Sequence, residues 1–185
     1  LESLTKYFVR KWNHSSYSYP MHLIMWFAIF SCRREAEITR MQLDDYDETN
    51  KLWKIRDLKN PNGSKGNHKE FSVHDDCQQM IDLLLDGDVR HRMLKRGYDE
   101  NLLVPLSPKT MGSEFRKACK LLGIDDLHFH DLRHEGCTRL AEKGMTIPQI
   151  QQVSLHDSWS SRERYVSVKV RKNVICVDQI LKLIA

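Results

Sequence analysis

The stretch "LHFHDLRHEGCTRLAEKG", Leu127 to Gly144, joins a histidine-rich turn to a run with helical spacing. His130 and Arg133 are three residues apart, so they share one face of a helix. Small and apolar residues mark a different face: Leu132, Gly136, Cys137 and Leu140. The stretch therefore predicts a helix that is packed on one side and carries an imidazole and a guanidinium near its amino-terminal end.

That end of a helix favours anions. It carries partial positive charge and backbone N–H groups without partners in the helix. A guanidinium and an imidazole beside it would complete an anion site, and phosphate is the anion that such groups bind most often. The pattern thus points to a phosphate-handling site.

Two other interpretations of the turn are open. His130 and His134 have the i, i+4 spacing of metal ligands, but no glutamate follows the first histidine and Arg133 lies between the two. A cation next to a divalent ion is unfavourable, which argues against a metal site. A purely structural cluster of satisfied histidines is the remaining alternative, and the rest of the chain has to decide.

The flanking segments predict a mainly α fold with a small antiparallel β-sheet, an α+β class. "YPMHLIMWFAIFSCRREAEITRM", residues 19–41, is apolar nearly all round as far as Phe30 and predicts a helix at the centre of the core. "KLWKIRDLK" (51–59) and "EFSVH" (70–74) alternate apolar and polar residues, which predicts a β-hairpin with a long basic loop. Further helices are predicted within 3–12, 75–87, 107–124, 146–153 and 173–185.

Composition sets the broad class. The chain has 185 residues, 41% hydrophobic and 29% charged, which suits a single globular domain over 1–185. Its net charge of +4 leans mildly toward anionic partners. Five cysteines without a C-x-x-C pair predict reduced thiols and a cytoplasmic location. The longest apolar run is about half of a membrane span, so no membrane partner is expected.

Four further residues gain meaning through their order along the chain. Arg34 is predicted at the end of the core helix and precedes Glu37 by three residues, a spacing that by itself usually marks a surface ion pair of little energetic value. His156 lies in "SLHDSW", and Tyr165 follows it by nine residues in "RERYVSV".

In this order the motifs resemble the catalytic domain of the tyrosine recombinases, or phage-type integrases. "SCRREAEITRMQLDDYD" is similar to the family's first box and places its arginine at Arg34. "HDLR" supplies the His-x-x-Arg pair, His130 and Arg133. "SLH" is similar to the L-G-H box and gives His156, with Tyr165 as the nucleophile. The similarity runs from about Leu4 to Val170, and the order and spacing of the boxes are its specific feature.

The family also has a catalytic lysine on a β-hairpin between the first arginine and His-x-x-Arg. Lys59 ends the first predicted strand, 25 residues after Arg34, and is the residue that the resemblance favours. Lys65, in "SKGNHK", is the alternative. The sequence departs from the family at Cys32 and Leu155, which stand where glycine is usual, and at Ala36, which replaces serine.

The resemblance implies a site-specific DNA recombinase that uses no metal and no cofactor and forms a 3′-phosphotyrosyl intermediate. It implies double-stranded DNA as the partner, a homotetramer on two DNA sites and a monomer for the isolated domain. The family's N-terminal DNA-binding domains are expected to be absent from this chain. The carboxy-terminal helix would pack either on its own chain or on a neighbouring protomer.

Three rival functions remain. A type IB topoisomerase-like enzyme would share the chemistry but would nick and close one duplex without exchanging partners. A DNA-binding module could keep the fold and lose catalysis, although the intact set of site residues argues against decay. A helical structural domain with coincidental histidines is the third.

Overall fold

The computed structural model describes residues 1–59, 63–95, 97–156 and 169–185. The described elements follow one another in this order: α1 (Glu2–Trp12), α2 (Met21–Ser31), α3 (Glu35–Ile38), the 3-10 turn η1 (Leu43–Asp45), β1 (Tyr46–Asp47), β2 (Leu52–Ile55), β3 (Lys69–Ser72), α4 (Asp75–Leu85), α5 (Gly87–Leu94), α6 (Pro108–Leu121), α7 (Asp131–Glu142), α8 (Ile147–Ser154) and α10 (Val177–Ile184). The predicted class, helices with a small antiparallel sheet, is confirmed.

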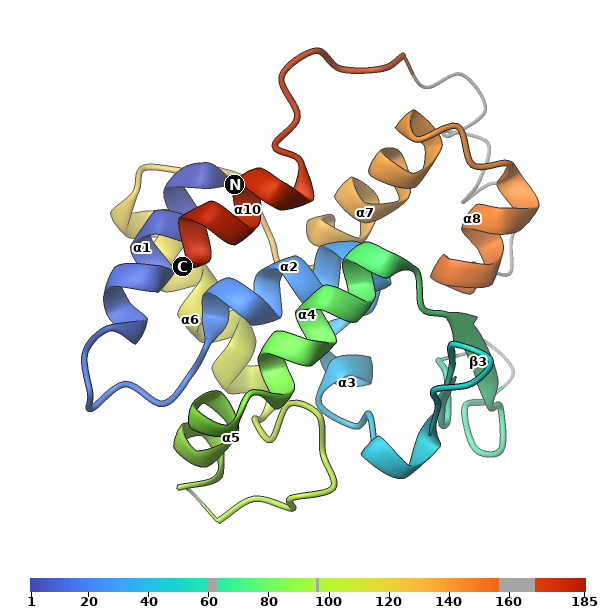
Figure 1. The fold of residues 1–185 in the computed structure, drawn as a ribbon, viewed down its shortest axis with the longest axis horizontal. Helices are drawn as coiled ribbons and strands as arrows, with labels where there is room; N and C mark the ends of the chain where they lie inside the picture. The colour runs from blue at the N-terminus through green and yellow to red at the C-terminus, as the bar shows by residue number, and fades with distance from the viewer. Residues whose placement is uncertain (60–62, 96, 157–168) are drawn as a thin grey trace.

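Helix α2 is the centre of the core, as the sequence predicts. All of its residues from Met21 to Ser31 are buried. Figure 1 shows α2 in the middle of the molecule, and it packs against α1, α4, α6 and α7. A helix that is apolar on every side can be stable in water only when other elements surround it. Helices α1, α4, α6 and α7 therefore surround α2.

Helix α2 ends earlier than the sequence suggests. Cys32 adopts a left-handed conformation with φ of 54°, which stops the helix at Ser31. Arg34 is consequently the N-cap of the short helix α3 and is not at the end of the core helix. The prediction was wrong on this point because only the backbone geometry at Cys32 reveals the break.

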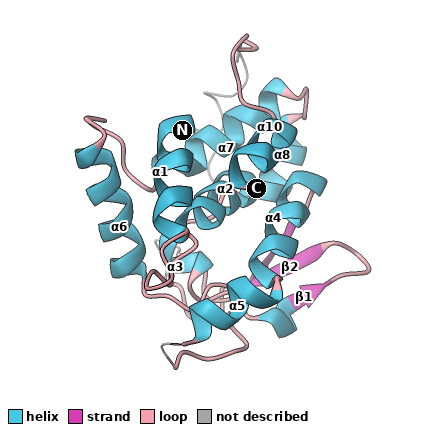
Figure 2. Cartoon of the chain, turned by 60° about the vertical axis from the view of Figure 1, so that its left-hand side comes forward, coloured by secondary structure: helices cyan, strands magenta, loops and turns pink. Residues whose placement is uncertain are grey.

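The sheet has three strands in the order β1-β2-β3, all antiparallel. Trp53 and Ile55 of β2 face the core and Lys54 is less buried, which confirms the predicted alternation. Trp53 pairs with Phe71 in β3 and with Tyr46 in β1. Figure 2 shows the sheet at one edge of the helical body.

Helices α7 and α8 position the site residues. The predicted inner face of α7 is confirmed, because Leu132, Gly136, Cys137 and Leu140 are all buried. Helix α8, predicted within 146–153, begins with a capping box between Thr146 and Gln149. It packs against α7 and β3, so the turn that follows α8 lies near the first turn of α7.

The carboxy-terminal helix packs on its own chain in this structure. Helix α10 contacts α1, and Ile180 is completely buried. Both views place α10 beside α1 (Figures 1 and 2). In the parts of the chain that the structure describes, no helix is long and apolar enough to cross a membrane.

Gly136 allows α7 to approach α2 closely. A Cβ at this position would lie 2.0 Å from the carbonyl oxygen of Ile29 and 2.8 Å from Sγ of Cys32. Because backbone cannot yield cheaply, we expect Gly136→Ala to lower the free energy of unfolding by about 2–3 kcal/mol, measured by urea denaturation.

Gly87→Ala is the matched control for this substitution. A Cβ at Gly87 meets nothing within 4 Å, so this variant should unfold at the same urea concentration as the parent protein. Equal midpoints for the Gly136 and Gly87 variants would show that the two helices can separate without cost.

Candidate active site

Arg133 lies in the first turn of α7 and is almost completely buried, with 4% of its surface exposed. Its Nη1 donates to the carbonyl oxygen of Cys32 at 2.6 Å. Its Nε donates to Nε2 of His156 at 3.1 Å. These two bonds hold the guanidinium between the end of α2 and the end of α8.

The charge of Arg133 is maintained despite its burial. Burial and the nearby positive charges of Arg33 and Arg34 lower its pKa to about 10, while Glu37 acts in the opposite direction. A group with this pKa is still protonated at neutral pH. The site thus contains a buried, fixed positive charge, which is the kind of group that binds a phosphate strongly when water is excluded.

His156 is buried and is fixed by contacts at both of its ring nitrogens. Its Nε2 accepts the hydrogen bond from Arg133, and its Nδ1 lies 3.0 Å from Oγ of Ser154. Because Nε2 accepts, the neutral ring carries its proton on Nδ1. The structure therefore brings His156 and Arg133 together as the sequence predicts, and shows His156 orienting the guanidinium.

Glu37 joins the first arginine to this pair. The side chain of Glu37 is 3% exposed, and its Oε1 accepts from Nη1 of Arg34 at 2.7 Å. Burial by itself would raise the pKa of Glu37, but the charges of Arg33, Arg133 and Arg34 outweigh it and lower the pKa overall. This carboxylate is buried among three arginines, so the pair is not the surface ion pair that its spacing alone usually marks.

Arg33 lies next to the site, and no sequence motif assigns it a role. Its side chain is fully buried, donates to the carbonyl oxygen of Val153 at 2.6 Å and lies 4.8 Å from the ring centroid of Phe71. It therefore links α2, α8 and β3. The sequence did contain an indication of this, because side chains of adjacent residues point in different directions. In the pair Arg33-Arg34 the two arginines could therefore be expected to have different surroundings.

His130 is arranged differently from the buried pair. It is the N-cap of α7 and its side chain is 67% exposed. Its Nε2 lies 3.1 Å from Oδ1 of Asp131, and its ring stacks on His128 at 5.6 Å. It also acts electrostatically on Glu35, whose pKa burial raises. His130 is thus accessible to a ligand at the amino-terminal end of α7.

Both candidate lysines lie on the segment between β2 and β3, and both are exposed. Lys59 directly follows Leu58, which is buried and pairs with the backbone of Asn67 at 2.8 Å. Lys65 lies in the turn between Ser64 and Asn67. Both lysines therefore lie next to hydrogen-bonded backbone positions, since the N–H of Gly66 also donates to Oδ1 of Asp57 at 2.7 Å.

The remaining site prediction, Tyr165, lies outside the residues that the structure describes. The described residues on either side, His156 and Arg171, both contact α7 or its side chains. Among the described residues, no group of three or more His, Cys, Asp and Glu side chains could hold a metal ion.

The two departures at usual glycine positions share one conformation. Cys32 and Leu155 have φ of 54° and 56°, in the left-handed region. For residues other than glycine this conformation costs roughly 1–2 kcal/mol each. The backbone geometry that glycine would favour is therefore retained here in spite of the substitutions, next to the two groups that accept hydrogen bonds from Arg133, the carbonyl of Cys32 and the ring of His156.

Known proteins resemble this chain in sequence and in overall fold. A 65-residue part of the chain, 35% of it, is 38% identical to the shufflon-specific DNA recombinase of Escherichia coli and covers 17% of that protein. The fold matches XerA recombinase with a TM-score of 0.62 at 21% identity, over 98% of this chain and 60% of that one. It also matches a lambda integrase dimer bound to a COC′ core site, with a TM-score of 0.61 at 18% identity, over 95% and 62% of the two chains.

The chain therefore spans less than two thirds of these solved recombinase chains, and the curated relative is matched over a smaller part of its length. The model of the phage integrase family matches residues 4–172, which is nearly the whole sequence. The chain therefore belongs to the phage integrase family.

Proposed function

We propose that this chain is the catalytic domain of a site-specific DNA recombinase that cuts and rejoins DNA through a 3′-phosphotyrosyl intermediate. The observation that carries the proposal is the buried guanidinium of Arg133, fixed by Cys32 and His156 at the amino-terminal end of α7. A fixed buried cation at such a place is suited to a charged phosphodiester.

The transition state of the reaction determines what each residue has to do. Attack of a tyrosine on a phosphodiester builds negative charge on the two non-bridging oxygens. Arg133 and Arg34 are proposed to donate N–H groups to these oxygens, because a guanidinium has several donors in a fixed fork. His156 would hold Arg133 in place, and Glu37 would hold Arg34.

Proton transfers complete the proposed mechanism. Tyr165 attacks with its phenolic oxygen, and a free tyrosine has a pKa near 10, so its proton needs an acceptor. The exposed imidazole of His130 is the proposed base. Lys59 is the proposed acid, which gives a proton to the departing 5′ oxygen. The bond between phosphorus and the 5′ oxygen breaks as the bond between phosphorus and the tyrosine oxygen forms. A 5′-hydroxyl of the partner strand then attacks the phosphotyrosyl group, forms a new phosphodiester and releases the tyrosine.

The proposal also covers partners and setting. The substrate is double-stranded DNA, and a homotetramer would exchange strands between two sites, whereas the isolated domain would be a monomer. The reaction as proposed requires no metal and no cofactor, since the two arginines provide the charge. The protein would act in the cytoplasm of a bacterial host, in the integration or excision of a prophage or other mobile element.

A denaturing gel tests the proposal. The domain, and a form extended at its N-terminus, are incubated with supercoiled plasmid and nicked duplexes in EDTA, and the gel is examined for protein covalently linked to DNA. We expect an EDTA-resistant band. Absence of the band for the extended protein on its own site would contradict the proposal and favour a DNA-binding module without catalysis. Recombinant products from two tethered sites would distinguish a recombinase from a nicking and closing enzyme.

A further inference from the structure

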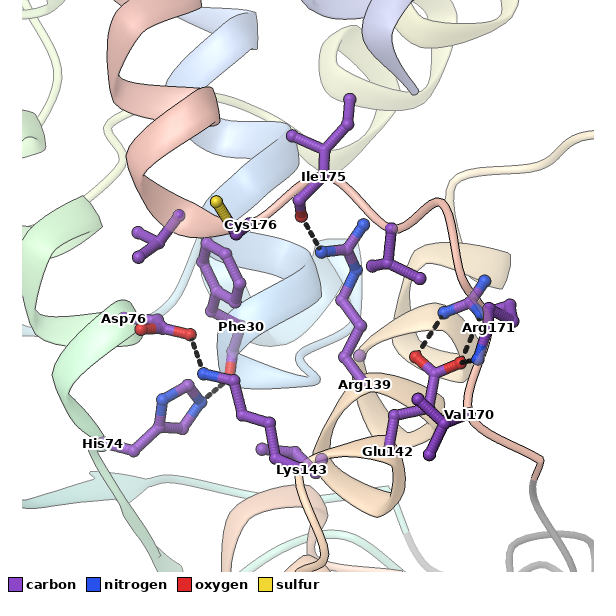
Figure 3. Close-up of a pocket in the computed structure, with 14 residues that line it drawn as sticks. Phe30, His74, Asp76, Arg139, Glu142, Lys143, Val170, Arg171, Ile175 and Cys176 are labelled. Carbon is purple, nitrogen blue, oxygen red and sulfur yellow. Dashed lines mark hydrogen bonds and ion pairs between the residues drawn. The ribbon is translucent and has the colours of Figure 1, made fainter.

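Arg171 is clamped by two glutamates of α7. Its Nε and Nη2 donate to the two carboxylate oxygens of Glu142 at 2.6 and 2.9 Å, and its backbone N–H donates to Glu142 at 3.1 Å. Its Nη1 and Nη2 donate to Glu135 at 2.9 and 3.2 Å. Figure 3 shows the pairing of Arg171 with Glu142. We call these three residues the Arg171 clamp.

A second contact holds the chain beyond the clamp. Arg139, which lies between the two glutamates on the same helix, donates from Nη1 to the carbonyl oxygen of Ile175 at 2.6 Å (Figure 3). Its Nε donates to Glu135 at 2.7 Å. A cavity of about 260 Å³ lies between α7 and this part of the chain and is lined by Leu140, Val174 and Ile175, among others. The outer face of α7 thus fixes residues 171–175.

The clamp differs from an ordinary surface ion pair. An isolated exposed pair contributes little, whereas a forked guanidinium bound to two carboxylates is fixed in position and direction. The side chains of Glu142 and Glu135 are only 7% and 19% exposed. Burial tends to raise the pKa of Glu135, but hydrogen bonds and charge from Arg171 and Arg139 lower it overall. Both carboxylates therefore remain ionised partners at neutral pH.

The helix that holds the clamp also carries Arg133. His156 is bonded to Arg133, and Arg171 is bonded to Glu135 and Glu142, so α7 holds the chain both before and after residues 157–170. Tyr165 follows His156 by nine residues and precedes Arg171 by six. An extended chain covers at most about 20 Å in six residues and about 30 Å in nine, so Arg171 is the shorter tether.

We propose that Arg171 is a positioning residue for Tyr165: its clamp on Glu135 and Glu142 fixes the chain on the same helix that holds the phosphate-binding Arg133. The inference rests on the proposed function and extends it to the delivery of the nucleophile. Arg171 touches neither the phosphate nor the tyrosine in this role. It acts by limiting where the tyrosine can lie relative to Arg133 of its own chain.

Two variants of opposite charge test the clamp. Arg171→Ala removes a positive charge and Glu142→Gln removes a negative one, so any direct electrostatic effect on DNA affinity has opposite sign in the two. We expect both to lower the rate of covalent adduct formation at saturating DNA by about tenfold or more, because small misplacements of a reacting group are costly. Arg171→Lys keeps the charge but loses the fork and should have an intermediate rate.

Lys172→Ala is the matched control, since it removes an exposed charge from the next position and should keep the parent rate. Circular dichroism confirms that each variant is folded. Adduct rates for Arg171→Ala and Glu142→Gln equal to the Lys172→Ala rate would overturn the proposal. A loss in Arg171→Ala that is absent from Glu142→Gln would also overturn it, because Arg171 would then act on DNA directly.

A measurement without DNA tests whether the Arg171 clamp fixes the backbone, independently of whether the protein reacts with DNA. Hydrogen exchange by mass spectrometry reports on residues 169–175, and Glu142→Gln should speed exchange there at least about fivefold, since the N–H of Arg171 loses its charged acceptor. Unchanged exchange would show that the clamp does not hold the chain and would overturn the inference. Faster exchange with no adduct from the extended parent protein would refute the proposed function itself, and the positioning role with it.

Discussion

Tyr165→Phe is expected to abolish the covalent link between protein and DNA while changing DNA affinity by less than about twofold. Phenylalanine has no oxygen to attack phosphorus, so no adduct can form through this residue. Binding should persist because contacts to the DNA backbone come mainly from lysine and arginine. A denaturing gel measures the adduct, and fluorescence anisotropy with a labelled duplex measures affinity.

Tyr98→Phe is the control for this prediction. Tyr98 is 41% exposed and lies far along the chain from the proposed motifs, so its variant should form adduct at the parent rate. An adduct formed by Tyr165→Phe would show that another residue is the nucleophile. Mass spectrometry of the peptide that remains bound to the DNA would then identify that residue.

The sequence predicts well those parts of the fold that depend on burial of apolar side chains. The continuous apolar run of α2 and the inner face of α7 must both be buried in the core, because exposure of either to water would be unfavourable. The alternation in β2 likewise determines which side of the hairpin is buried. These features place Arg133 at the edge of the core, in the first turn of α7.

Backbone conformations and buried polar contacts could not be predicted in the same way. The left-handed turn at Cys32 separates α2 from α3, yet cysteine has no preference for that region. The burial of Glu37 depends on Arg133 of α7 and on Arg33 and Arg34, which follow the turn, and these come together only in the folded chain. The pairing of Arg171 with Glu135 spans 36 residues and follows no local rule.

Arg133→Ala is expected to reduce the rate of adduct formation by about 100- to 1000-fold, in line with the loss of one strong donor to the transition state. It should also weaken DNA binding and reduce stability, because the carbonyl oxygen of Cys32 and Nε2 of His156 lose their donor in a buried place. Each buried acceptor left without a partner costs about 1–3 kcal/mol.

Arg133→Lys separates the chemical role of Arg133 from its structural one. A lysine keeps the charge, but one ammonium group cannot reproduce the fork that reaches Cys32 and His156 together. We expect this variant to be more stable than Arg133→Ala in urea denaturation and still to be at least about tenfold slower than the parent protein in single-turnover cleavage. Arg10→Ala, on the exposed side of α1, controls for the loss of one positive charge and should leave both measurements unchanged.

The comparison of these three variants determines what the buried guanidinium does. Parent-like cleavage by Arg133→Lys would mean that charge alone is sufficient and that the fixed fork seen in the structure has no catalytic role. Parent-like cleavage by Arg133→Ala at a temperature where it is folded would assign the phosphate to other groups. Slow cleavage by a stable Arg133→Lys is the expected result, because only the guanidinium can bond to Cys32 and His156 while it directs further N–H groups at the phosphate.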